Sequence, residues 1–328
     1  MQRILLLVTF LLLTNGSAGE LPDGIRTRTV LNYPDCLELF NDTTSVTLGH
    51  HVGGRVLSFQ LNGKEALYLD PAESDWKTAK RKLVTAGRFD IGPEYKIPKR
   101  DALWIRPWKA KPIGPRAVRM NSAFEPVTGV RLIREFRLSA KGTHLSCRQI
   151  IRNESKTTRH WCHWSRTFAK HGGIGIVPVG QLSKFPNNYV MYEGRGLINA
   201  RPKDNNIQLV DNYLLVKDVP KFPKLGFDSM VGWFAYQMKH DLLFVKKYDT
   251  FPNRPYNEVA GLTISIWYPP SEKIDAVELE PIGPMNNIPS GGQAEFTEHW
   301  YLLERDYPKT VDKAYLKTIE KRIHQLHD

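Results

Sequence analysis

The clearest structural signal lies in the stretch Ala276-Val-Glu-Leu-Glu-Pro-Ile-Gly-Pro-Met-Asn-Asn-Ile-Pro-Ser-Gly-Gly-Gln-Ala-Glu-Phe-Thr-Glu-His-Trp-Tyr-Leu-Leu303. Val277 and Leu279 alternate with Glu278 and Glu280, which predicts a β-strand with both glutamates on one face. A loop rich in Pro, Gly and Asn follows, and then a second strand. A carboxylate at the end of a strand is rigidly held yet open to a cleft, so Glu280 is a candidate catalytic or binding acid. A lone strand-end glutamate is more commonly a solvated residue.

The rest of the chain predicts short strands separated by turns. Asn62-Gly63 is a strong hairpin signal. Only the tail has helical spacing, with Thr310 as the expected N-cap. We therefore predict an all-β sandwich over residues 20–308 and an amphipathic helix over residues 309–328. The expected strands include residues 44–48, 55–61, 130–138, 144–152, 159–168 and 262–268, and a hairpin over residues 225–248.

The first 19 residues predict a signal peptide. Arg3 supplies a positive charge, Ile4 to Leu13 form an apolar run, and Gly16-Ser-Ala18 provides a small-residue cleavage site. The apolar run is too short to span a bilayer. We expect export to the periplasm or beyond, without insertion of the mature chain into the membrane.

The three cysteines are Cys36, Cys147 and Cys162, so at most one internal disulfide is possible. A bridge between Cys147 and Cys162 requires their two strands to pair. No His/Cys cluster has zinc spacing, and the glycines after His171 lack the pattern of a nucleotide-binding loop. The sequence predicts no metal and no organic cofactor.

Positive charge is concentrated in one region of a chain whose formal net charge is +12. Between Lys77 and Arg119 stand 13 Lys or Arg residues and three acidic residues, interleaved with Tyr95, Trp104 and Trp108. In an exported protein, an acidic polysaccharide is a better partner for such a stretch than nucleic acid. A solvated loop of basic side chains is an equally good interpretation.

Several of these segments resemble the galactose mutarotase-like (aldose 1-epimerase) superfamily. The segments Leu279-Glu-Pro281, Pro289-Ser-Gly-Gly-Gln293 and Trp300-Tyr-Leu302 resemble its C-terminal motif, although its Pro-Gly-Glu turn is altered here. The opening segment Gly53 to Tyr68 is also similar. The resemblance implies a β-supersandwich and places Glu280 at the position of the catalytic base.

The same resemblance suggests two partners for Glu280. Arg88 matches the first arginine of a Gly-Arg segment that contacts the sugar, but Asp90 and Ile91 depart from that segment. By order and spacing, His163 is the best counterpart of the catalytic histidine, although strand alternation places it opposite Trp164. The further candidates for substrate binding are Trp164, Glu94 and Asp228.

These residues suit the interconversion of sugar anomers. A base removes the proton of the anomeric hydroxyl, and an acid protonates the ring oxygen as the ring opens. Glutamate and histidine have ordinary pKa values of about 4.3 and 6.5, so modest shifts bring either near neutrality. Glu280 is the expected base, His163 the expected acid and Arg88 the expected sugar anchor.

The same residues also fit other functions. A histidine on an apolar face, such as His163, is commonly a core residue. The basic, Trp-containing stretch fits a non-catalytic module for acidic polysaccharides. A polysaccharide lyase or hydrolase is a third class, in which Arg88 or Arg106 would neutralise a uronate carboxylate.

Overall fold

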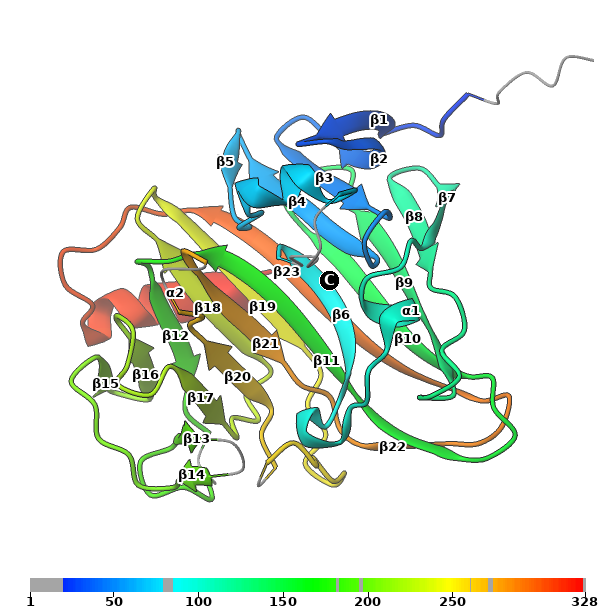
Figure 1. Cartoon of the computed structure of the whole chain (residues 1–328). Helices are drawn as coiled ribbons and strands as arrows, with labels where there is room; N and C mark the ends of the chain where they lie inside the picture. The colour runs from blue at the N-terminus through cyan, green and yellow to red at the C-terminus, as the bar shows by residue number, and fades with distance from the viewer. Residues whose placement is uncertain are drawn as a thin grey trace, which may run out of the picture.

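The computed structural model describes residues 20–78, 85–180, 183–194, 197–259, 261–270 and 274–326. The predicted signal peptide lies outside these residues. Their strands form two antiparallel sheets that pack face to face (Figure 1). This architecture confirms the predicted all-β sandwich.

The first sheet contains 13 strands within the described residues. In spatial order they are β1 (Ile25–Val30), β2 (Tyr33–Phe40), β3 (Thr44–Gly49), β4 (Arg55–Leu61), β6 (Gly87–Gly92), β11 (Arg159–Lys170), β21 (Ala276–Pro281), β20 (Ile264–Trp267), β17 (Lys224–Phe227), β13 (Val190–Gly194) and β14 (Leu197–Asn199). In addition, β5 (Lys64–Glu65) pairs with β4, and β22 (Asn286–Ile288) pairs with β11.

The second sheet contains ten strands within the same described ranges. In spatial order they are β15 (Ile207–Val210), β16 (Tyr213–Val216), β12 (Ile174–Pro178), β18 (Trp233–Met238), β19 (Leu242–Tyr248), β23 (Gln293–Glu304), β10 (Leu145–Asn153), β9 (Val130–Leu138), β8 (Ala117–Asn121) and β7 (Lys109–Gly114).

Strand β21 has opposite chemistry on its two faces. Val277 and Leu279 are buried in the core between the sheets, in one cluster with Phe244 and Trp300 of the second sheet. Successive side chains of a strand point to opposite faces, so Glu278 and Glu280 lie on the outer face of the first sheet. The predicted placement of both glutamates on one face is confirmed by their shared contact with Arg166.

Two turns test the hairpin predictions. The Asn62-Gly63 turn joins β4 to β5, and both residues have positive φ, 49° and 79°. The predicted hairpin over residues 225–248 is only half right. Strand β18 pairs with β19 in the second sheet, but β17 belongs to the first sheet, because the chain crosses between sheets after Phe227.

The helices are short. They are η1 (Pro71–Asp75), η2 (Glu94–Lys96), α1 (Asp101–Trp104) and α2 (Lys313–His324). Helix α2, red in Figure 1, lies against the outer face of the second sheet and buries Leu316, Ile319 and Ile323 there. Its N-cap is Asp312, which accepts a hydrogen bond from the backbone of Tyr315, and not the predicted Thr310. In the described ranges, no helix is both long and apolar enough to cross a bilayer.

The cysteines are all free and buried. Cys147 lies on β10 and Cys162 on β11, which belong to different sheets and do not pair, so the condition for a bridge between them is not met. Among the described residues, no group of three His, Cys, Asp or Glu side chains is arranged to hold a metal ion.

Candidate functional site

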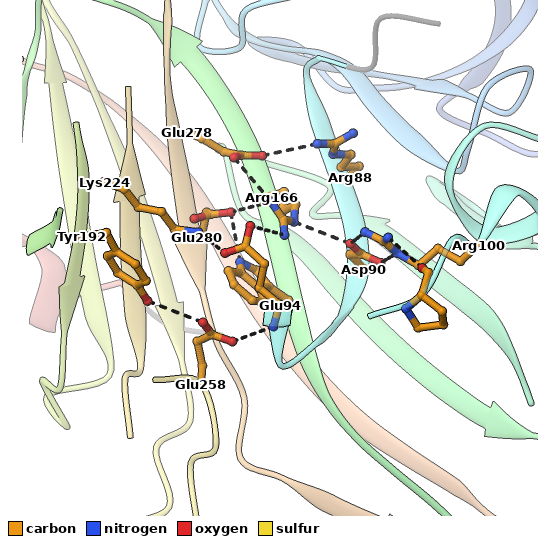
Figure 2. Close-up of polar contacts among 12 residues, drawn as sticks. Arg88, Asp90, Glu94, Arg100, Arg166, Tyr192, Lys224, Glu258, Glu278 and Glu280 are labelled. Carbon is orange, nitrogen blue, oxygen red and sulfur yellow. Dashed lines mark hydrogen bonds and ion pairs between the residues drawn. The ribbon is translucent and has the colours of Figure 1, made fainter. Parts of the chain in front are cut away.

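A cluster of charged side chains covers the outer face of the first sheet where β6, β11 and β21 run side by side (Figure 2). Arg166 on β11 lies opposite Arg88 on β6, and Trp164 lies opposite Asp90. These alternate residues share a face because side chains along a strand have a period of two. Local alternation in three strands therefore assembles one polar surface.

Arg166 is the centre of this cluster. Its guanidinium lies 3.3 Å from Glu280, 3.6 Å from Asp90 and 3.7 Å from Glu278. Burial opposes the charge of Arg166, but these carboxylates outweigh burial and raise its pKa. The guanidinium of arginine is a planar, rigid fork of donors, so it can contact several carboxylates at once.

Glu280 is held from two sides and has no exposed surface. Trp164 Nε1 donates a hydrogen bond of 3.0 Å to its Oε1, and the same oxygen is the one that contacts Arg166. No hydrogen bond from the described residues reaches its other oxygen, Oε2. A buried acceptor without a donor is uncommon in native proteins and is a reason to look for a functional role.

Glu278 and Arg88 form a second, looser pair. Their closest atoms are 3.6 Å apart, and the Arg88 guanidinium lies 3.4 Å from the centre of the Trp104 ring. Burial and the neighbouring Glu280 raise the pKa of Glu278 to about 8. The carboxyl of Glu278 is therefore protonated at neutral pH, where an ordinary glutamate is charged.

The raised pKa of Glu278 predicts a pH-dependent stability. The folded protein binds this proton more tightly than the unfolded chain does, so the stabilisation is complete below about pH 4.5 and is lost as the pH rises through about 8. Relative to Glu278→Gln, the wild-type free energy of unfolding should fall by up to about 1.4 kcal/mol per pH unit in this interval. Urea unfolding between pH 5 and 9 measures the effect, and parallel curves for the two proteins would contradict it.

A cleft of about 830 Å³ opens beside the cluster. This volume is within the range of small-molecule sites. Its polar lining comes from Glu94, Tyr192, Lys224, Asn257 and Glu258, and its apolar lining includes Tyr95, Ile97, Ile198 and Val259. Glu280 is not one of the lining residues. Arg166 connects the two, because it contacts both Glu280 and the lining residue Glu94.

Two lining residues of the cleft, Lys224 and Glu94, form an ion pair. Burial raises the pKa of Glu94, but Lys224 and Arg166 outweigh burial and hold that pKa below its usual value. Lys224 Nζ also lies 4.9 Å from the centre of the Tyr192 ring and 5.4 Å from that of Trp164. This packing places a cation and two aromatic rings together, a combination suited to sugar rings and hydroxyl groups.

His163 does not reach this site, which corrects the expectation that it acts with Glu280. It lies on the opposite face of β11 from Trp164 and is fully buried between the sheets. Its ring stacks on Phe89 and Phe296, with centroids 5.6 and 5.7 Å away. Burial lowers its pKa to about 3, so it is a neutral core histidine.

Replacement of His163 tests this assignment. His163→Leu keeps a similar volume in an apolar setting. If the chain catalyses the anomer interconversion that the sequence suggests, this change should alter its rate less than threefold. The rate of interconversion by NMR, together with thermal unfolding to confirm the fold, provides the measurement. A loss of more than about 100-fold in a folded variant, the scale of a missing acid–base group, would restore His163 to the mechanism.

The other predicted site residues divide into two groups. The structure brings Arg88, Trp164 and Glu94 to the cluster around Glu280. Asp228 lies elsewhere: it accepts hydrogen bonds of 2.8 Å from the Ser183 hydroxyl and 2.7 Å from the Lys184 backbone. Asp228 does not line the cleft. It follows directly after β17, which ends at Phe227, and its hydrogen bonds anchor the loop at Ser183 and Lys184.

The basic stretch does not form one patch among its described residues. Arg88 and Arg100 belong to the cluster, and Arg100 forms a bidentate pair with Asp90. Arg116 pairs with Asp23 and Arg119 with Glu135, on other parts of the surface. Lys80, Arg81 and Lys82 lie outside the described residues.

Four residues of the site were not identified from the sequence. Arg166 had a signal, since it stands two positions after Trp164 in a predicted strand and so shares its face. Lys224 lies just before a predicted strand. Tyr192 and Glu258 carry no motif, and only the packing of the chain brings them to the cleft.

No family model and no curated protein matches the chain. Solved structures do resemble it. A galactose mutarotase-like protein from Lactobacillus casei superposes with a TM-score of 0.58 at 10% identity, covering 82% of this chain and 100% of the other. A galactose mutarotase related enzyme from Lactobacillus acidophilus gives 0.53 at 11%, covering 84% and 100%. A candidate aldose 1-epimerase from Escherichia coli K12 gives 0.54 at 10%, covering 81% and 98%.

Proposed function

We propose that this protein, which has the galactose mutarotase-like fold, binds a sugar in the cleft and interconverts its anomers by acid–base chemistry. The observation that carries the proposal is the position of Glu280. It stands at the end of a central strand, held by Trp164 and Arg166, with one oxygen that receives no hydrogen bond from the described residues. A fixed carboxylate with a free oxygen is suited to take a proton from a hydroxyl group.

The reaction is a proton exchange around one ring opening. Oε2 of Glu280 removes the proton of the anomeric hydroxyl, and the electrons of that O–H bond form the carbonyl. The bond between the anomeric carbon and the ring oxygen breaks, and the ring oxygen receives a proton from a second group. Rotation and closure on the other face reverse both transfers.

Charge at the cluster supports an uncharged sugar. Three cations there already contact a carboxylate, so an anionic substituent would compete with a carboxylate of the protein for its partner. The contacting pairs are Arg100–Asp90, Arg166–Glu280 and Lys224–Glu94. We therefore place neutral aldoses ahead of uronates and of acidic polysaccharides as ligands.

Access to Glu280 requires a small rearrangement of residues that line the cleft. Lys224 and Glu94 line the cleft, whereas Glu280 has no exposed surface. The side chain of Glu94 is 41% exposed, so solvent screens its pair with Lys224. Sugar hydroxyls can replace such a pair with hydrogen bonds, which would bring the anomeric carbon close to Glu280.

The proposal is tested by NMR exchange spectroscopy on a panel of aldoses and uronic acids. Acceleration of anomer exchange above the spontaneous rate for at least one neutral aldose is the expected result. Binding without acceleration would leave a sugar-binding protein without catalysis. Salt-sensitive binding to acidic polymers alone would favour the polysaccharide-binding alternative.

We also propose that the mature chain acts outside the cytoplasm, because residues 1–19 have the pattern of a signal peptide. Sequencing the N-terminus of the protein recovered from the periplasm or medium is the test. An N-terminus that still contains residues 1–19 would contradict the proposal.

A further inference from the structure

Anomer interconversion needs a proton donor as well as a base, and Glu258 has the right position. It lines the cleft, while its side chain is almost fully buried at 1% exposure. It follows β19 in a loop whose turn is closed by hydrogen bonds from Gly261 and Leu262 to the backbone oxygen of Glu258. This loop places the carboxyl against the cleft from the side opposite Arg88 (Figure 2).

The carboxyl group of Glu258 is buried and is held by two hydrogen bonds. The backbone N–H of Glu94 donates a hydrogen bond of 2.8 Å to Oε2, and the Tyr192 hydroxyl donates a longer one of 3.5 Å to Oε1. Among the described residues no ion pair involves Glu258, and Lys224, which favours the charged form of Glu258, pairs with Glu94. Oε2 therefore accepts a short hydrogen bond, whereas Oε1 accepts only the long one from Tyr192 and is the oxygen better placed to carry a proton.

Electrostatics agree with this geometry. Burial, supported by the charges of Glu94 and Glu280, raises the pKa of Glu258 to about 7. A general acid works best when its pKa lies near the working pH. The titratable groups that face Glu258 from the neighbouring elements are Glu94 of η2, Cys162 of β11, Tyr192 of β13, Lys224 of β17 and Glu280 of β21.

The other groups of the cleft are poorer donors. Burial and the nearby Glu258 raise the pKa of Tyr192 well above its usual value, so this phenol gives up its proton reluctantly. Lys224 is engaged with Glu94, and Cys162 is fully buried. His163 lies on the other side of the sheet.

We infer that Glu258 is the proton donor of the reaction, which rests on the function proposed above. As the bond between the anomeric carbon and the ring oxygen breaks, its electron pair stays on the ring oxygen, and the proton on Oε1 of Glu258 is transferred there. Glu258 is left as a carboxylate and Glu280 as a carboxylic acid. Ring closure returns both protons, so the enzyme is unchanged after each turnover.

The test compares wild type, Glu258→Gln, Glu258→Asp and the control Glu154→Gln. Glu154 pairs with Arg131 away from the cleft, so its variant should behave as wild type.

Wild-type kcat should fall tenfold per pH unit above about pH 7, as Glu258 loses its proton. At pH 6, Glu258→Gln should lose about 100-fold or more of the rate and also lose this pH dependence. Glu258→Asp should restore part of both.

The outcomes separate the two proposals. An active wild type with an active Glu258→Gln, within threefold and with the same pH profile, would overturn the role of Glu258 and leave the function intact. A wild type that accelerates no aldose would overturn the function itself, and the donor role with it. Circular dichroism and thermal unfolding exclude misfolding, and a ¹³C titration of Glu258→Gln against wild type identifies the carboxyl signal that titrates near pH 7.

Discussion

Glu280→Gln should abolish anomer interconversion, with a loss of about 10²- to 10⁴-fold in kcat, the contribution typical of a positioned acid–base group. The amide has nearly the same shape and can still accept the hydrogen bond from Trp164 Nε1. It cannot take a proton from the anomeric hydroxyl. The substitution therefore removes the chemical step while keeping the shape of the site.

NMR exchange rates of the wild type and the variant provide the measurement. Sugar binding, followed by the quenching of tryptophan fluorescence, should persist in the variant. Glu154→Gln again serves as the charge-matched control. A folded Glu280→Gln variant with the wild-type rate would contradict the assignment of the base, whichever group acts as the acid.

Arg166→Met should have the largest effect on stability. The arginine is 7% exposed and contacts the carboxyl groups of Asp90, Glu278 and Glu280. In the variant, Glu280 loses the cation that contacts it at 3.3 Å. Removing one partner of a buried charge network leaves uncompensated charge and costs about 3–5 kcal/mol. Methionine fills much of the space, so the loss is chiefly electrostatic.

Urea unfolding at pH 7 measures this loss. The matched control is Arg131→Met, which breaks an exposed pair with Glu154 and should cost no more than about 1 kcal/mol. The smaller Arg166→Lys change keeps a positive charge and should recover part of the stability, but not the planar contacts. Equal costs for Arg166→Met and Arg131→Met would show that the cluster is well solvated.

Strand periodicity predicted much of the fold. Alternation placed Glu278 and Glu280 on one face of β21, and short strands with turns between them indicated a sandwich. The helical spacing of Leu316, Ile319 and Ile323 predicted α2 and its buried face. These are local properties, set by side-chain direction along a strand or a helix, so the sequence alone is sufficient for them.

The site was predicted only in part, because its geometry is not local. Order along the chain favoured His163, and alternation already placed it opposite Trp164. The sequence does not say which of those two faces meets the other sheet. The packing of Phe296 against His163 puts the histidine in the core and leaves Trp164 with Glu280.

The sequence by itself determined the strand periodicity and the polar face of β21, and its resemblance to the superfamily pointed to Glu280 as a candidate site residue. Tertiary structure decided which residues surround Glu280 and the charge states of Glu278 and Glu258. Burial of Glu278 and Glu258 raises their pKa values to about 8 and about 7, whereas Arg166 and Trp164 hold Glu280. Glu258 reaches the cleft through a loop with no motif. Burial and the approach of charges depend on which distant segments pack together, and that is a property of the folded chain alone.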